Sequence, residues 1–134
     1  MILVDTSVWS LILRRKPGIL AETETAIMIR LQTLIKERQV KLIGPIRQEL
    51  LTGIKRSKQF EAVSDALHSF RDESITTTDY ELAAAFSNKC LSAGVATTSV
   101  DLLICAVAFN RQWSVFSMDT DFQRYAIILG IGLY

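Results

Sequence analysis

Acidic side chains stand directly after two apolar segments of this chain. A short apolar run, residues 2–4, ends at Asp5 in the stretch MILVDTS. Late in the chain, Asp119 and Asp121 follow another apolar segment in the stretch VFSMDTDF. Residues just past the carboxyl ends of parallel strands line the crevice in which open α/β sheets bind ligands. These acids can therefore meet at one edge of a sheet, although more than a hundred residues separate Asp5 from Asp119.

Two further acids fall on helices that we expect to be largely buried. In PIRQELLTG, Glu49 shares a helix face with Ile46 and Gly53. In SVDLLICAVAF, Asp101 opens a helix so apolar that it must be buried nearly all round. An unpaired carboxylate beside such surfaces is costly, or it stays protonated.

Two interpretations of these four acids remain open at this point. The local one treats Asp101 as an anion favoured by the helix dipole in a first turn, and Asp5 and Asp119 as turn or capping residues. The other brings all four carboxylates together, where they repel one another and a hard divalent cation would neutralise them. Oxygen ligands without histidine or cysteine select Mg²⁺ or Mn²⁺ over zinc.

Hydrophobic periodicity predicts the elements that must position these acids. Short apolar runs predict strands over residues 2–4, 40–43, 74–76, 114–117 and 131–134. Helical spacing predicts helices over residues 7–15, 21–38, 60–70, 79–92, 102–109 and 119–127, with another that begins at Gly44-Pro45. Ser7, Thr78 with Glu81, and Ser99 are the predicted helix caps, and Pro17-Gly18 ends the first helix. The alternation predicts an α/β/α sandwich around a mainly parallel sheet of four or five strands, in a single domain over residues 1–134.

Composition restricts the class of protein. With 134 residues, 49% of them hydrophobic, the chain can bury a core and is not disordered. A net charge of +1 gives no global field that marks a nucleic-acid binder. Cys90 and Cys105 lack metal-site spacing and are predicted core residues of a reducing compartment. No membrane-spanning run or basic leader is present, so we expect a soluble cytoplasmic protein.

Taken together, the motifs resemble those of the PIN-domain ribonucleases, and most closely the VapC-type toxins of prokaryotic toxin–antitoxin pairs. The resemblance rests on the strand that runs into D-T-S, the P-x-x-x-E-L and D-L-L-I-x-A-x-A helices, and the late D-x-D-F. It covers the whole chain and implies a PIN-like fold. Residue by residue, it implies an acidic pocket made by Asp5, Glu49, Asp101 and Asp119, with Asp121 as the alternative fourth ligand and the hydroxyls of Thr6 and Ser117 as support. Ser117 stands where family members often have threonine.

The resemblance also implies an activity and partners. It implies endoribonuclease activity, with one or two Mg²⁺ ions (or Mn²⁺ as a substitute) held by Asp5, Asp101 and Asp119. Glu49 would bind a second metal or orient the attacking water. The implied partners are the RNA substrate, a VapB-type antitoxin held in a groove near the first helices, and a second copy in a homodimer. The extra apolar surface of the first helix, around Trp9, fits either such a groove or the chain's own core.

Three other classes of protein share part of this pattern. A haloacid-dehalogenase-like phosphatase needs a second aspartate two residues after Asp5, where this chain has Ser7. A response-regulator receiver domain needs a late lysine, and no lysine follows Lys89. A catalytically inactive PIN-like domain that binds RNA or protein remains the alternative to an enzyme.

Overall fold

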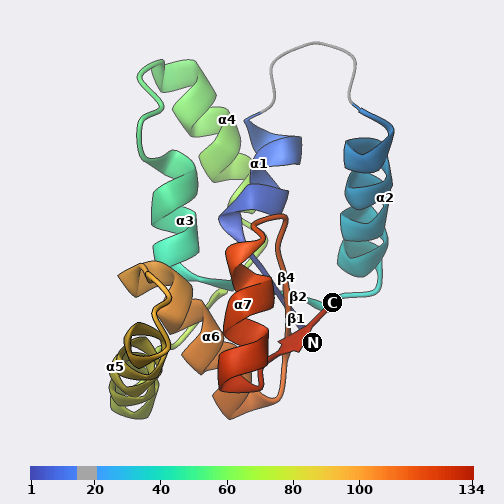
Figure 1. Ribbon diagram of the computed structural model, residues 1–134. Helices are drawn as coiled ribbons and strands as arrows, with labels where there is room; N and C mark the ends of the chain where they lie inside the picture. The colour runs from blue at the N-terminus through green and yellow to red at the C-terminus, as the bar shows by residue number, and fades with distance from the viewer. Residues whose placement is uncertain (15–20) are drawn as a thin grey trace.

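Five parallel strands form the central sheet of the computed structural model, which describes residues 1–14 and 21–134 (Figure 1). The strands are β1 (Ile2–Val4), β2 (Val40–Ile43), β3 (Asp72–Glu73), β4 (Ser114–Phe116) and β5 (Gly132–Leu133). They lie in the order β3-β2-β1-β4-β5, and every neighbouring pair is parallel. The predicted α/β architecture is confirmed, with the larger of the two expected strand numbers.

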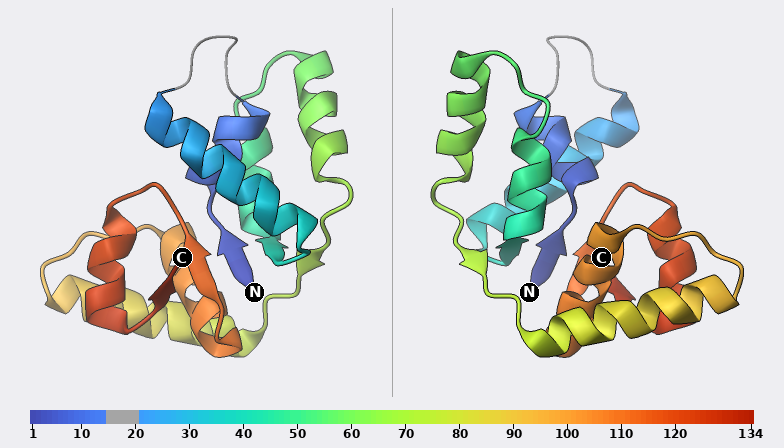
Figure 2. Two further views of the ribbon diagram at one scale, coloured as in Figure 1. Left: turned by 90° about the vertical axis from the view of Figure 1, so that its right-hand side faces the viewer. Right: turned by 90° about the vertical axis from the view of Figure 1, so that its left-hand side faces the viewer.

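Helices connect the strands and cover both faces of the sheet. They are α1 (Thr6–Leu13), α2 (Glu22–Lys36), α3 (Gly44–Leu51), α4 (Ser57–Leu67), α5 (Thr77–Ser92), α6 (Ser99–Arg111) and α7 (Asp121–Leu129). Figure 2 shows α2 crossing one face of the sheet in its left view, and α5 and α6 on the opposite side in its right view. Among the described residues, no helix combines the length and apolar character that a membrane span requires.

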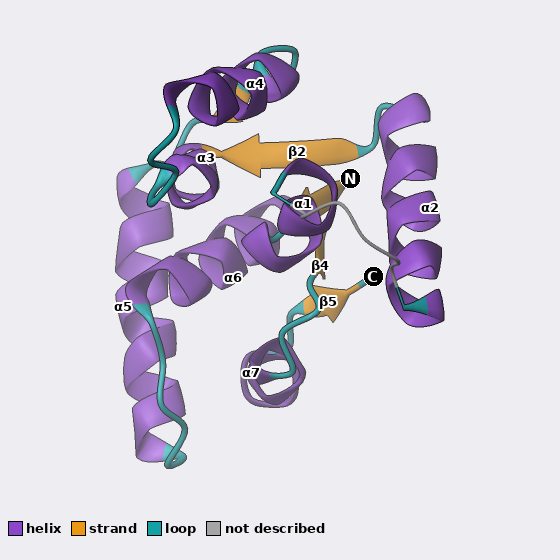
Figure 3. Ribbon diagram, turned by 90° about the horizontal axis from the view of Figure 1, so that it is seen from above, coloured by secondary structure: helices purple, strands orange, loops and turns teal. Residues whose placement is uncertain are grey.

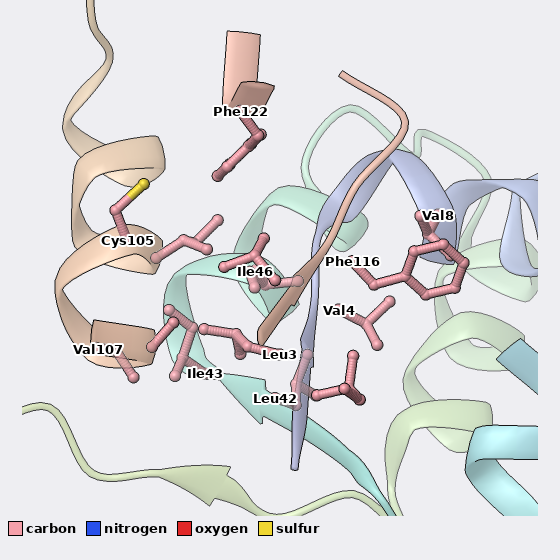
Figure 4. Close-up of a cluster of buried hydrophobic side chains, with 14 of the residues drawn as sticks. Leu3, Val4, Val8, Leu42, Ile43, Ile46, Cys105, Val107, Phe116 and Phe122 are labelled. Carbon is pink, nitrogen blue, oxygen red and sulfur yellow. The ribbon is translucent and has the colours of Figure 1, made fainter. Parts of the chain in front are cut away.

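The hydrophobic core lies on both sides of β1. Leu3 and Val4 are fully buried, and they point to opposite sides of the strand (Figure 4). Cys105 packs on the Leu3 side, and both it and Cys90 are buried free thiols, as predicted. Seen from above, α1 lies over the end of β1 (Figure 3). Only Asp5 separates the last residue of β1 from the first residue of α1.

Three helix caps differ from the predicted ones by one or two residues, and α4 and α6 begin three residues before their predicted starts. The observed caps are Asp5 instead of Ser7, Thr76 instead of Thr78, and Thr98 instead of Ser99. Each observed cap has extended backbone angles and a side-chain oxygen that accepts a backbone N–H of the first turn. Where several hydroxyl or carboxyl residues stand side by side, the sequence alone does not select the one with that backbone.

Element boundaries also differ at the edges of the sheet. The third strand is Asp72–Glu73 and not residues 74–76, because two charged side chains are fixed there by ion pairs with Arg47 and Lys41 and not by burial. The last helix begins at Asp121 instead of residue 119, and the last strand covers only two of the four predicted residues. The predicted stop of the first helix at Pro17-Gly18 lies outside the described residues.

Candidate active site

Asp5 links the central strand to the first helix. It follows β1, caps α1, and is only 6% exposed. Its backbone N–H donates to the carbonyl of Phe116 at 2.9 Å, which ties the end of β1 to the end of β4. One carboxylate oxygen, Oδ2, accepts the backbone N–H of Ser7 at 3.3 Å. Within the described residues, the other oxygen, Oδ1, accepts no hydrogen bond.

Two serine hydroxyls, Ser7 and Ser117, hold the same oxygen of Asp5, and we call this pair the serine clamp. Each hydroxyl donates to Oδ2 at 2.8 Å, so both protons are directed at that oxygen although the hydroxyls lie only 3.3 Å apart. Their oxygens accept backbone N–H groups in return, Ser7 from Met118 at 2.9 Å and Ser117 from Asp119 at 3.0 Å. The clamp therefore fixes the segment after β4 relative to Asp5.

Glu49 reaches the same helix start from α3. The Thr6 hydroxyl donates to Oε2 of Glu49 at 2.7 Å. Thr6 is the first residue of α1, next to Asp5, so this bond joins the carboxylate of α3 to the edge at which β1 ends. The support that was expected from Thr6 and Ser117 is thus present as hydrogen bonds, with Thr6 acting on Glu49 and Ser117 on Asp5.

Asp101 stands in the first turn of α6, half-buried, behind the Thr98 cap. Burial, together with weaker repulsion from Asp5, Asp119 and Glu49, raises the pKa of Asp101 to about 6, although a hydrogen bond with the Thr98 side chain lowers it in part. The repulsion means that the other three predicted acids all lie within electrostatic reach of Asp101. The hydroxyl of Tyr125 approaches Oδ2 of Asp101 at 3.5 Å, and burial, with the Asp101 charge, raises the pKa of Tyr125, which keeps this neighbour a neutral donor.

The acids of the DTD stretch have different roles. Asp119 is exposed after β4, and its Oδ1 accepts the backbone N–H of Asp121 at 2.9 Å. Its charge acts directly on Asp101. Asp121 is the first residue of α7, and its charge acts on Tyr125. Asp119 therefore belongs to the group of four carboxylates, and Asp121 lies beside it.

The four carboxylates have no cationic side chain as an ion-pair partner among the described residues. The ion pairs found there all involve other acids: Glu73, Asp72 and Asp79. In residues 1–14 and 21–134, no three acidic, imidazole or thiol groups stand close enough to enclose a metal ion by themselves. Mg²⁺ usually keeps several waters and takes one or two carboxylates, so spaced oxygen donors with an open Asp5 Oδ1 fit that ion. Asp5, Asp101 and Asp119 are the residues that would hold it.

Two residues of this site were missed in the sequence. Ser7 was interpreted only as a helix cap, although its hydroxyl stands two residues after an acid and can reach that carboxylate. The contact of Tyr125 with Asp101 could not be predicted, because the two residues are 24 positions apart and Tyr125 occupies an ordinary apolar position of a helix. The arrangement as a whole can gather cations at the carboxyl edge of the sheet.

Comparison with known proteins places this geometry in a family. The chain resembles three solved structures along its full length: FitAcB from Neisseria gonorrhoeae (22% identity, TM-score 0.77, 100% of this chain and 96% of that chain), VapBC2 from Rickettsia felis bound to a promoter DNA fragment (16%, 0.75, 100% and 98%), and VapBC-1 from nontypeable Haemophilus influenzae (16%, 0.66, 100% and 97%). At these identities the likeness establishes the fold. A search of curated proteins found no significant match. The family model described as "PIN domain" matches residues 2–128, and the chain therefore belongs to the PIN domain family.

Proposed function

We propose that this protein is a Mg²⁺-dependent endoribonuclease and the toxin of a type II toxin–antitoxin pair. PIN domains are generally nucleases, which supports the hydrolytic part of the proposal. The observation that carries it is the group of four carboxylates near the carboxyl edge of the sheet, three of which repel Asp101, without a cationic ion-pair partner among the described residues. A group of this kind is unfavourable for the fold on its own and becomes favourable when it binds a cation.

Each acidic residue has a distinct role in the proposed reaction. A bound divalent ion would supply Lewis acidity for the phosphate and a nucleophile at neutral pH. Asp5 is held in one orientation by the serine clamp, which leaves Oδ1 free of hydrogen bonds from the described residues and able to bind an ion. Burial disfavours the charge on Asp101, so a nearby cation would stabilise it. Glu49, fixed by Thr6, would orient the attacking water or hold a second ion.

The proposed partners follow from the related structures. The similar FitAB and VapBC structures contain antitoxin partners, and VapBC2 and FitAB were solved bound to DNA fragments. Their likeness to this chain supports a VapB-type antitoxin as its partner. The apolar surface of α1 is partly free for contact: Trp9 is 2% exposed and belongs to the core, while Leu11, Ile12 and Leu13 are half-buried. We also propose that the active form is a homodimer.

Cleavage of RNA by a single-residue variant tests the activity. Purified protein and the Asp101→Asn variant are incubated with total RNA in Mg²⁺ or Mn²⁺, and the new 5′ ends are sequenced by direct ligation, which requires a 5′-phosphate. We expect defined cleavage sites for the wild-type protein and none for Asp101→Asn. The matched control is Asp65→Asn, an exposed acid on α4, which should cleave like the wild type. Equal cleavage by Asp101→Asn and the wild type would refute the site.

Thermal melting separates an active site from an inactive PIN-like module. Mg²⁺ at about a hundred times its dissociation constant should stabilise the wild-type protein by about 2.7 kcal/mol. The same titration should leave the melting temperature of a variant with all four acids replaced by their amides unchanged. Metal binding without RNA cleavage would favour the inactive binding module.

A further inference from the structure

A cavity of about 500 Å³ shares no lining residue with the acidic group. It is bounded by the end of α2, by β2, and by the connection from α4 to β3, a region visible at the right of the left view in Figure 2. Ile35, Val40, Leu42 and Phe70 give it an apolar floor. No residue of the acidic group lines it, so its function does not depend on the proposed nuclease activity.

The rim of this cavity is cationic. Three basic side chains, Arg38, Lys41 and Arg71, stand around it with one acid, Glu73. Lys41 Nζ is paired with Glu73 Oε1 at 2.7 Å. Arg38 and Arg71 are exposed and form no ion pair with any residue in the described part of the chain. Two arginine side chains are therefore left to attract an anion to an apolar cavity.

The backbone at Arg38 is unfavourable for an arginine. Its φ is +56°, in the left-handed region, and it follows the last turn of α2 at the position where glycine is common. Its N–H donates to the carbonyl of Ile35 at 3.0 Å, and the N–H of Gln39 donates to the carbonyl of Leu34 at 3.0 Å. Glycine would make these helix-ending bonds without strain. A strained arginine at the rim is an outlier of the kind that often accompanies a functional site.

We propose that this cavity binds an acidic peptide segment of a partner protein, with an apolar side chain on its floor and carboxylates at Arg38 and Arg71. Guanidinium groups bind carboxylates through paired hydrogen bonds, which suits two arginines beside an apolar floor. A nucleic acid fits this cavity less well, because it needs a longer track of cations and exposed rings for stacking. Three of the four floor residues are aliphatic, and the ring of Phe70 already packs edge-on against Trp9 at 5.0 Å.

A titration followed by NMR of the ¹⁵N-labelled full chain tests the proposal. The probe is the peptide acetyl-Glu-Leu-Leu-Glu-amide, compared with acetyl-Gln-Leu-Leu-Gln-amide and a single-stranded RNA octamer. We expect saturable amide shifts at residues 38, 41 and 71 with the acidic peptide, at a dissociation constant of about 1 mM. The glutamine peptide should bind about tenfold more weakly, since it loses the charged hydrogen bonds.

Matched variants locate the binding. Arg71→Gln and Arg38→Gly should each weaken acidic-peptide binding about tenfold, and Lys58→Gln, an exposed cation on α4, should leave it unchanged. Glycine is the residue that the left-handed backbone at position 38 favours, so Arg38→Gly should not lower the melting temperature. A loss of peptide binding by this variant therefore cannot be explained by unfolding. Equal binding of both peptides, shifts confined to other surfaces, or no binding of the acidic peptide up to about 5 mM would overturn the proposal. Tighter binding of the RNA octamer that the same arginine variants abolish would overturn it in favour of a nucleic-acid site.

Discussion

The serine clamp gives the sharpest prediction about stability. Ser117→Ala removes a 2.8 Å hydrogen bond to a carboxylate that is 6% exposed, and it also removes the acceptor for the N–H of Asp119. A hydrogen bond to a charged group contributes about 1.5–3 kcal/mol, so we expect the free energy of unfolding to fall by about 2 kcal/mol. For a domain of this length, that loss lowers the melting temperature by about 8 °C.

A double-mutant cycle shows whether the charge on Asp5 is the reason. In an Asp5→Asn background, the hydroxyl of Ser117 meets a neutral amide, and a neutral hydrogen bond contributes about 1 kcal/mol. Ser117→Ala should therefore cost about 1 kcal/mol less in that background than in the wild type. Urea denaturation of the four proteins measures both values. The measurement is made in EDTA, so that bound metal does not contribute.

The matched control is Ser10→Ala in the same helix as Ser7. The Ser10 side chain forms no hydrogen bond with any described residue, and alanine is a good helix former, so we expect a change within about 0.5 kcal/mol. If Ser117→Ala changed stability no more than Ser10→Ala, the hydrogen bonds of the serine clamp would contribute nothing measurable to stability. A Ser117→Ala cost that stayed the same in the Asp5→Asn background would show that the carboxylate charge is not involved.

Three further predictions concern other charged groups. The raised pKa of Asp101 means that its negative charge destabilises the metal-free fold. Asp101→Asn should therefore raise the free energy of unfolding by about 2 kcal/mol, measured by urea denaturation in EDTA at pH 8, and a decrease would contradict this. Asp79 is 1% exposed, and paired hydrogen bonds from Arg111 hold its pKa well below its usual range. The pair therefore stabilises the fold fully above the unfolded pKa of about 4, and this stabilisation is lost progressively as pH falls below that value. Asp79→Ala should accordingly cost about 3 kcal/mol at pH 7 and much less at pH 2 in melting experiments, and a pH-independent cost would be the contrary result. Arg38→Gly should stabilise the protein by up to about 1 kcal/mol, and a clear loss in urea denaturation would argue against backbone strain at this position.

The sheet and the positions of the acids could be predicted because they depend on local patterns. Continuous apolar runs predicted β1, β2 and β4, and parallel strands bring the residues after their ends to one edge. Asp5 and Asp119 meet there for that reason. Glu49 and Asp101 were predicted from their unusual position on buried helices, and their electrostatic contact agrees with that interpretation.

The parts that could not be predicted depend on partners distant in sequence. β3 contains no apolar run, and the pairing of Asp72 with Arg47, 25 residues away, fixes it in the sheet. Asp79 looked like an ordinary first-turn acid, but Asn110 and Arg111 bind it from the end of α6. Pairs of this kind have no signature in a single sequence, because either member alone is a common surface residue.

Asp5 combines the two interpretations that the sequence left open. As a helix cap it uses Oδ2, which accepts the N–H and hydroxyl of Ser7 and the hydroxyl of Ser117. As a proposed metal ligand it would use Oδ1, which no described residue contacts through a hydrogen bond. A substitution at Asp5 therefore removes a cap, the acceptor of the clamp and a proposed ligand together, and its loss of activity would not separate folding from chemistry. The carboxylate of Asp101 has fewer structural contacts: the hydroxyls of Thr98 and, at 3.5 Å, of Tyr125 approach it, and it does not cap its helix. The decisive activity measurement for this site is consequently the one on Asp101, although Asp5 is the more prominent residue in the sequence.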